Sequence, residues 1–226
     1  MIKFYFHHTP NPRKVALALE EMGLAYEVVP VDTYKGEQHA PAFRKINPNA
    51  KLPAIEDDGV AVFDSSAILL YLAEKTGKFL GAPGDRAALL SWLMFIGTGL
   101  GPFSGQAVHF SRVHADSAYA TNRYRHEVER HYDVLNDRLT ASKFIASDEY
   151  TIVDMSAWGW VALAGYILGD DEAMERWPHL KRWFQSVDAR PAAARARSVG
   201  KDLKFKSDFD EETMRAMFPQ NFSAAV

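Results

Sequence analysis

The segment LPAIEDDGVAVF, residues 52–63, contains the clearest strand signal in the chain. Two apolar runs, residues 52–56 and 60–63, flank the turn DDG at residues 57–59. An Asp-Gly pair between apolar runs is typical of a tight hairpin, because glycine accepts the positive φ that the turn needs. The segment therefore predicts an antiparallel β-hairpin, with a proline just before its first strand.

Strand and helix signals upstream and downstream of the hairpin complete one small unit. The predicted strands are residues 2–6 and 26–31, and the predicted helices are residues 15–22, 42–46 and 66–75. The order is therefore β-α-β-α-β-β-α. Strands on either side of a helix are expected to be parallel, and hairpin strands antiparallel, so the unit predicts a mixed four-stranded sheet.

Beyond a Gly-Ala-Pro-Gly linker at residues 81–84, strand signals nearly vanish. A long helix bent by several glycines is predicted first, and further helices follow, over residues 86–114, 122–139, 152–167, 178–188 and 210–217. The helix at 152 follows Thr151-Ile152-Val153-Asp154, a capping box with Asp in place of Glu. The fold class is α/β plus all-α, with a first domain at 1–78, a linker at 79–85 and an all-helical domain at 86–226.

Composition excludes several kinds of chemistry. The 226 residues carry a formal net charge of −3, which gives no electrostatic signature for nucleic acid. We see no segment with the ~20 apolar residues that span a bilayer, no signal peptide and no metal-ligand spacing among the histidines. We therefore expect a cytoplasmic protein without a metal. Because the chain has no cysteine, any thiol chemistry must use the sulfur of a bound small molecule.

The junction of the first strand and first helix, Thr9-Pro10-Asn11-Pro12, is one candidate site. Proline is favoured at the first helical position, so placing Pro12 there predicts Asn11 as the N-cap. A helix N-terminus offers free N–H groups and positive dipole charge, which lower the pKa of a nearby thiol. The Thr9 hydroxyl and Asn11 amide can then donate to a sulfur, although a plain cap and turn explain the same residues.

Two further candidate sites lie on either side of the hairpin. Before it, residues 51–53 form either an ordinary trans strand start or a cis bond that exposes the Leu52 backbone to an extended ligand. After it, Asp64, Ser65 or Ser66 caps the next helix, and the same geometry can hold a carboxylate at Ser65 and an ammonium at Asp64. The predicted topology brings all three sites to one edge of the sheet.

A set of short motifs spans both halves of the chain. In the first half they are Thr9-Pro10-Asn11 with Lys14, Lys35-Gly36-Glu37-Gln38, and residues 47–55 and 64–75. In the second half they are Gly99-Leu100-Gly101-Pro102, Gly105-Gln106, Arg123-Tyr124 and residues 150–154. With these motifs the chain resembles the glutathione transferase superfamily, and within it the bacterial Nu class of disulfide-bond oxidoreductases. The resemblance implies a thioredoxin-like first domain, a helical second domain and a homodimer.

The resemblance also implies glutathione as cosubstrate and a place for each end of that tripeptide. It places Thr9 and Asn11 at the sulfur, and the Leu52 backbone, before a cis bond to Pro53, against the cysteinyl part. The remaining implied contacts are Asp64 and Ser65 at the γ-glutamyl end, Gln38 and Lys51 at the glycyl end, and Arg123 from the helical domain. One departure is Asp64, where the subclass often has the longer Glu, so its ammonium contact is expected to be longer or bridged by water.

Two aromatic side chains outside this set are further candidates for the site. Some glutathione transferases activate the thiol with an N-terminal tyrosine, but Tyr5 lies inside the first strand, where a packing role is expected. His109, in the long bent helix, is the candidate for contact with the second substrate.

Three functions remain open. The leading hypothesis is reduction of a small disulfide or a peroxide by two bound glutathiones, with no covalent role for the protein. The alternatives are conjugation of one glutathione to a small electrophile, and a non-catalytic interaction module of the same fold.

Overall fold

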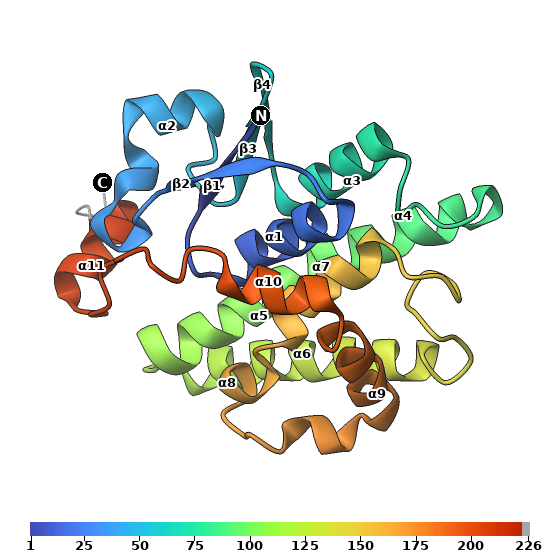
Figure 1. Ribbon diagram of the computed structural model, residues 1–226. Helices are drawn as coiled ribbons and strands as arrows, with labels where there is room; N and C mark the ends of the chain where they lie inside the picture. The colour runs from blue at the N-terminus through green and yellow to red at the C-terminus, as the bar shows by residue number, and fades with distance from the viewer. Residues whose placement is uncertain (223–226) are drawn as a thin grey trace.

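The computed structural model describes residues 1–222, and its first domain is built on one four-stranded sheet (Figure 1). The strands are β1 (Ile2–Phe6), β2 (Tyr26–Pro30), β3 (Ala54–Asp57) and β4 (Val60–Phe63), in the spatial order β2-β1-β3-β4. β1 and β2 are parallel, whereas β3 is antiparallel to both β1 and β4. The predicted hairpin and mixed sheet are therefore confirmed.

Helices cover both faces of this sheet because successive strand residues point to opposite sides. Phe4 and Phe6 join the main core with α1 (Pro10–Met22) and α3 (Ser65–Thr76). Tyr5, between them, packs with Phe43 of α2 (Pro41–Ile46) on the other face, as expected for a strand residue. Two short 3₁₀ turns, η1 (Thr33–Lys35) and η2 (Glu37–His39), connect β2 to α2.

The second half of the described chain is helical. Its α-helices are α4 (Arg86–Phe95), α5 (Gly101–Val108), α6 (Ala118–Arg138), α7 (Ile152–Val161), α8 (Ala164–Leu168), α9 (Pro178–Asp188), α10 (Pro191–Ser198) and α11 (Glu211–Met217). Its short elements are the π-helical η4 (Ile96–Leu100) and η5 (His109–Val113) and the 3₁₀ turns η3 (Pro83–Asp85), η6 (Ala173–Arg176) and η7 (Pro219–Phe222). The predicted domain boundaries, at residues 78 and 86, stay predictions. Helix α3 ends at Thr76 and α4 begins at Arg86.

Three details of the helical half differ from the sequence prediction. The long helix predicted at 86–114 is interrupted by one π-helical segment, which contains Gly97 and Gly99, and ends in a second. The helix predicted at 152–167 is two helices, because the chain leaves helical geometry at Leu163. Helix α10 was not predicted, since a short Pro-Ala-Arg segment shows no apolar periodicity and is helical here through packing against α1.

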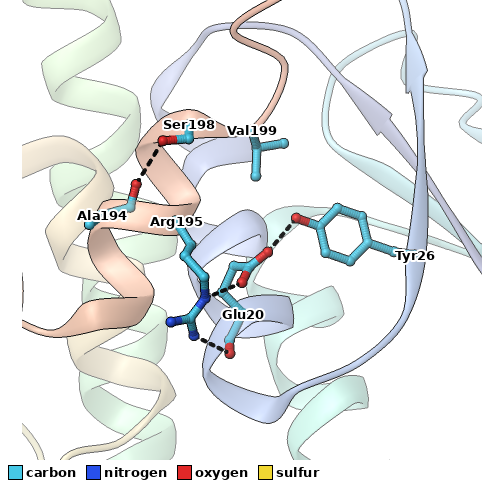
Figure 2. A pocket seen from close by; sticks show the side chains of 6 residues that line it. All are labelled: Glu20, Tyr26, Ala194, Arg195, Ser198 and Val199. Carbon is cyan, nitrogen blue, oxygen red and sulfur yellow. Dashed lines mark hydrogen bonds and ion pairs between the residues drawn. The ribbon is translucent and has the colours of Figure 1, made fainter.

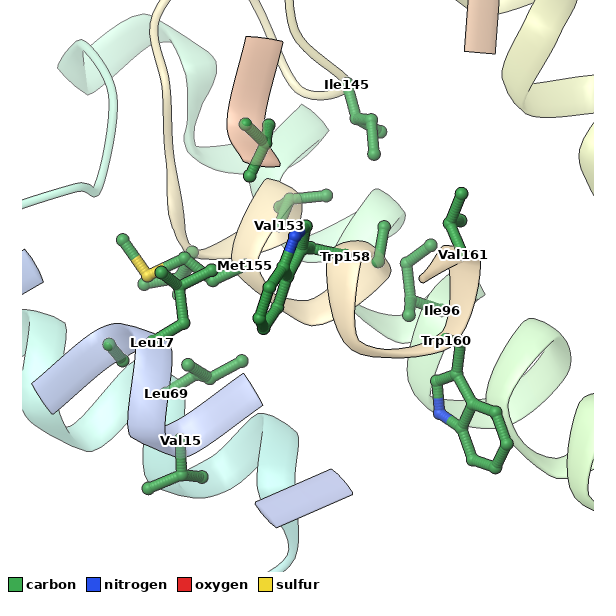
Figure 3. Packing of buried hydrophobic residues seen from close by; sticks show 14 of the residues in the cluster. Val15, Leu17, Leu69, Ile96, Ile145, Val153, Met155, Trp158, Trp160 and Val161 are labelled. Atoms are coloured by element: carbon green, nitrogen blue, oxygen red, sulfur yellow. The ribbon is translucent and has the colours of Figure 1, made fainter. Parts of the chain in front are cut away.

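Helix α7 is the centre of the molecule, and all ten of its residues are buried. It packs against α1 and α3 of the first domain and against α4 and α9 of the second. Figure 3 shows Trp158 among Leu17, Val153 and Met155, whereas the indole of Trp160 points away from that group. One core therefore crosses the boundary between the two domains and holds their facing surfaces in a fixed relation.

One helical run among residues 1–222, Pro83–Val113, is long and apolar enough by composition to cross a membrane, which the sequence analysis did not foresee. Within it, Leu89, Leu93, Ile96 and Leu100 are fully buried in the core shared with α1, α3 and α7. Packing inside the protein therefore accounts for part of its hydropathy, since 39% of the apolar window is buried.

Candidate active site

Helix α1 begins at Pro10, two residues before Pro12, which the sequence analysis placed at the first helical position. Its N-cap is Thr9, with extended backbone, and Pro10 and Pro12 both lie in the first turn; the assignment of Asn11 as N-cap was wrong. Neither proline has an N–H, and the Arg13 N–H donates to the Thr9 carbonyl oxygen at 3.3 Å. The backbone N–H of Asn11 is therefore left without a partner in the first turn, and the Thr9 hydroxyl makes no capping bond.

A cavity of about 960 Å³ opens beside this helix start, between the two domains. The first domain contributes Thr9, Thr33, Gln38, His39, Arg44 and residues 48–52. The helical domain contributes Gly105, Gln106, His109, Phe110 and residues 217–221. The last group reaches the cavity because α11 packs against η1 of the first domain, as its position in Figure 1 shows.

The walls of this cavity favour an anionic ligand. Among residues 1–222, none of those that line it is acidic, whereas Arg44 and Lys51 are cationic and His39 also lines it. Gln38 is buried, its Oε1 has no hydrogen-bond partner within the described part of the chain, and its Nε2 lies 3.2 Å from His39 Nε2. Burial lowers the pKa of His109, so this ring on the opposite wall is neutral at neutral pH. A ligand with carboxylates at one end and apolar contacts at the other fits such a site.

The loop before β3, at residues 47–53, forms part of the cavity wall. The Leu52–Pro53 bond is cis, as the family resemblance implied, and Leu52 lines the cavity. Asn47 helps to fix this loop, since its side-chain amide donates to the Lys51 carbonyl oxygen at 2.6 Å and its oxygen accepts from the Asn49 N–H at 2.9 Å. The Leu52 backbone is thereby presented at the cavity from a loop held by its own hydrogen bonds.

The third predicted site is organised differently. Asp64 is the N-cap of α3, with a positive φ of 71°, and its Oδ1 accepts from the N–H groups of Ser66 and Ala67 at 2.8 and 3.2 Å. Ser65, the first residue of α3, is buried and accepts a 3.5 Å bond from Lys14. Neither Asp64 nor Ser65 is among the residues that line the large cavity, so their contact with a ligand stays a prediction.

Lys14 is a buried cation that the sequence analysis noted only as part of a motif. It lies one turn into α1, and its ammonium group has Ser65 Oγ at 3.5 Å and the Trp160 ring centre at 5.9 Å. Burial, opposed by the Asp64 carboxylate, lowers the pKa of Lys14 to about 7. The start of α3 therefore has a partly charged lysine directly behind it.

Two predicted residues have other partners in this structure. Arg123, on α6, pairs with Glu127 at 2.8 Å, is 53% exposed, and is not among the cavity-lining residues. The Oδ1 atom of Asn11 accepts a 3.0 Å hydrogen bond from the Trp160 indole of α7. Their contacts with a ligand stay predictions. The sequence did not predict that Arg44, His39 and the segment 217–221 line the cavity or that Trp160 contacts Asn11. Local sequence patterns do not indicate contacts between distant parts of the chain.

A second, smaller depression lies away from this site. It has a volume of about 450 Å³ and is lined by Glu20, Tyr26, Ala194, Arg195, Ser198 and Val199 (Figure 2). Glu20 accepts from the Tyr26 hydroxyl at 2.7 Å and from Arg195 Nε at 2.6 Å, as the dashed lines in Figure 2 show. Its polar groups thus satisfy one another across the contact of α1, β2 and α10.

Within residues 1–222, no three His, Asp or Glu side chains converge as metal ligands would.

The sheet, the cis-proline loop and a cationic cleft between two domains define the class of thioredoxin-like enzymes that carry a helical second domain. The chain belongs to the glutathione S-transferase family. Residues 8–75 match the model of the glutathione S-transferase N-terminal domain, and residues 118–186 match that of the C-terminal domain.

Similar proteins have established names and solved structures. The chain is 44% identical to disulfide-bond oxidoreductase YfcG of Escherichia coli over 87% of this chain and 94% of the relative. It is 37% identical to disulfide-bond oxidoreductase YghU of the same organism, over 88% of this chain and 75% of the relative.

Two solved glutathione transferases have the same fold. That of Burkholderia graminis, with two glutathione molecules bound per subunit, is 34% identical with a TM-score of 0.79, over 86% of both chains. URE2P8 of Phanerochaete chrysosporium, with oxidised glutathione, is 32% identical with a TM-score of 0.84, over 89% of this chain and 96% of the other.

Proposed function

We propose that the protein is a glutathione-dependent disulfide-bond oxidoreductase that binds two glutathiones, or one glutathione disulfide, in the cavity between its domains. The observation that carries the proposal is a cleft that residues 1–222 line with cations and with no acidic side chain. It opens beside Thr9 at the start of α1, in a chain without cysteine. Two relatives named disulfide-bond oxidoreductases, and a neighbour with two glutathiones per subunit, support the same reaction.

The proposed chemistry is two successive thiol–disulfide exchanges. The thiolate of the first glutathione attacks one sulfur of the substrate disulfide, forms a mixed disulfide and releases one substrate thiolate. The second glutathione thiolate attacks the glutathionyl sulfur of that mixed disulfide, forms glutathione disulfide and releases the other substrate thiolate. Two thiols are oxidised, one disulfide is reduced, and the two protons lost by glutathione end on the released thiols. With a peroxide, the first attack gives an alcohol and glutathione sulfenic acid, which the second glutathione converts to the disulfide and water.

The protein's contribution is to stabilise the thiolate and to hold the two sulfurs close together. The Thr9 hydroxyl, the Asn11 backbone N–H and the Asn11 side-chain amide are the donors that we assign to the sulfur. Charge-assisted hydrogen bonds of this kind lower a thiol pKa and raise the thiolate fraction at neutral pH. Arg44 and Lys51 then attract the glycyl carboxylate at the other end of the cleft.

A disulfide reductase assay tests the proposal. We expect glutathione-dependent reduction of hydroxyethyl disulfide well above the uncatalysed rate, and a loss of about 10- to 100-fold in kcat/KM for Asn11→Ala. Full activity in that variant would contradict the assigned role. Glutathione binding without turnover would instead favour the non-catalytic interaction module.

Conjugation of glutathione to an electrophile is the second candidate. The apolar side chains Phe110, Met217 and Phe218 in the cavity wall favour it, because such surfaces accept an aromatic electrophile. Turnover of chlorodinitrobenzene with a stoichiometry of one glutathione per site would support conjugation over reduction.

We also propose a homodimer in the cytosol, where the glutathione pool is reducing. Exposed apolar side chains on edge strand β4, Val60 and Phe63, and on α4, Met94, support a contact with a second copy. Light scattering after size-exclusion chromatography should give twice the chain mass, and a monomer would contradict the assembly. Cell fractionation tests the compartment.

A further inference from the structure

Trp160 connects the helical domain to the turn that begins α1. Its indole N–H donates to Asn11 Oδ1 at 3.0 Å across the domain boundary. An indole N–H can only donate, so the atom of Asn11 that faces it must be the amide oxygen. The amino group of Asn11 is therefore turned the other way, and it has no hydrogen-bond partner among residues 1–222.

The indole has little freedom to leave this position. Trp160 is 8% exposed, and its ring lies near Gly101 and Gly105 of α5 and Lys14 of α1. A Cβ atom at Gly101 of α5 would lie 2.9 Å from Trp160 Nε1, so glycine is needed there for the ring to fit. On its other side, the Lys14 ammonium is 5.9 Å from the ring centre.

The backbone around Trp160 is also pressed against the start of α1. A Cβ atom at Gly159 would lie 2.7 Å from the Pro10 carbonyl oxygen and 2.8 Å from Lys14 Cγ. Helix α7 therefore contacts the same first turn to which Trp160 donates. The direction of the indole N–H is set by the packing of three helices and not by a flexible loop.

We propose that Trp160 is a positioning residue for thiol activation: by holding Asn11 Oδ1, it presents the Asn11 amino group as a hydrogen-bond donor to the glutathione sulfur. The proposal rests on the proposed function, which places that sulfur at Thr9 and Asn11. Without the indole N–H, the amide can rotate and offer its oxygen to the sulfur. An oxygen acceptor favours the protonated thiol, whereas an N–H donor favours the thiolate.

The variant that tests this is Trp160→Phe, which removes the N–H and keeps an aromatic ring. The matched control is Trp158→Phe, two residues earlier in α7, whose N–H donates at 2.9 Å to Asp188 and whose ring points elsewhere. We expect Trp160→Phe to raise the pKa of the bound glutathione thiol, measured from thiolate absorbance. The acid limb of the kcat/KM profile should move by the same amount, lowering the thiolate fraction at neutral pH by about 3- to 10-fold. Trp158→Phe should leave both unchanged.

A double-mutant cycle with Asn11→Ala separates positioning from packing. If Trp160 acts through Asn11, Trp160→Phe should have no further effect on the thiol pKa in the Asn11→Ala background. Asn11→Asp, which keeps an acceptor for the indole but has no N–H, should raise the thiol pKa at least as much as Asn11→Ala. An equal effect of Trp160→Phe in both backgrounds, or none in either, would overturn the proposal.

The thiol pKa is read on bound glutathione without turnover, so the two proposals can fail separately. A protein that binds glutathione with a lowered, Trp160-dependent thiol pKa but reduces no disulfide would refute the oxidoreductase and support the positioning role. A protein that shows no binding of glutathione by calorimetry would refute both.

Discussion

The starts of α7 and α1 show two opposite uses of the same element. At α7, Thr151 and Asp154 are fully buried, and the Asp154 carboxylate accepts from Thr151 N–H, Ile145 N–H and Trp183 Nε1 at 2.8 to 3.0 Å. At α1, Thr9 makes no side-chain cap and lines a cavity, and two prolines take the places of N–H donors in the first turn. A helix start whose donors are all satisfied internally is structural, whereas one with uncommitted donors is available to a ligand.

The largest expected effect is at the start of α7, with Asp154→Asn. Three strong donors converge on this carboxylate, and an amide would turn an N–H toward at least one of them. Because these groups cannot reach water, we expect a loss of about 3 kcal/mol or more in the free energy of unfolding, measured by urea denaturation. Asp202→Asn, at an exposed position, is the control and should change it by less than about 0.5 kcal/mol. Equal stability of the two variants would show that the buried carboxylate is not needed.

At the start of α1, Thr9→Val keeps the shape of the side chain but removes the hydroxyl, and it should reduce activity more than stability. We expect kcat/KM for disulfide reduction to fall about 10- to 100-fold, because a donor to the thiolate is lost. Stability should change by less than about 1 kcal/mol, since the hydroxyl makes no capping bond. Thr9→Ser retains a hydroxyl and should retain most of the activity. A large loss of stability in Thr9→Val would remove the contrast between the two helix starts.

The last expected effect is a pH dependence of stability at Lys14, a second buried ionisable group with fewer partners than Asp154. Burial lowers the pKa of Lys14 to about 7, against 10.5 for an ordinary lysine, with Asp64 opposing the shift. Between these values the unfolded chain binds the extra proton, so the wild-type unfolding free energy should rise with pH, by at most about 1.4 kcal/mol per unit.

The variant Lys14→Met should lack that rise and be more stable than the wild type near pH 7, with the difference shrinking toward pH 10. Chemical denaturation at several pH values measures this, with the exposed Lys201→Met as the matched control. Parallel pH profiles of the wild type and Lys14→Met would show that Lys14 keeps its proton throughout.

The contrast between the two helix starts was only partly visible in the sequence. The spacing of Thr151 and Asp154 predicted the capping box, because both partners lie within one turn. At α1, the preference of proline for the first helical position predicted Asn11 as the N-cap, where the structure has Thr9. The choice was settled by contacts of that turn with α7, which lies about 150 residues away in the chain and was beyond any local pattern.

The sequence by itself determined the two-domain order, the hairpin, the cis-proline loop through family resemblance, and the need for an external thiol. The domain order, the hairpin and the need for an external thiol follow from local periodicity, turn chemistry and composition. The cis bond follows only from the resemblance. Only the tertiary structure decided that Arg44, His39 and the segment 217–221 share a cavity with Thr9, and that Trp160 donates a hydrogen bond to Asn11. The physical reason is that a site between domains is made by the packing of helices far apart in sequence, and that packing depends on the whole core.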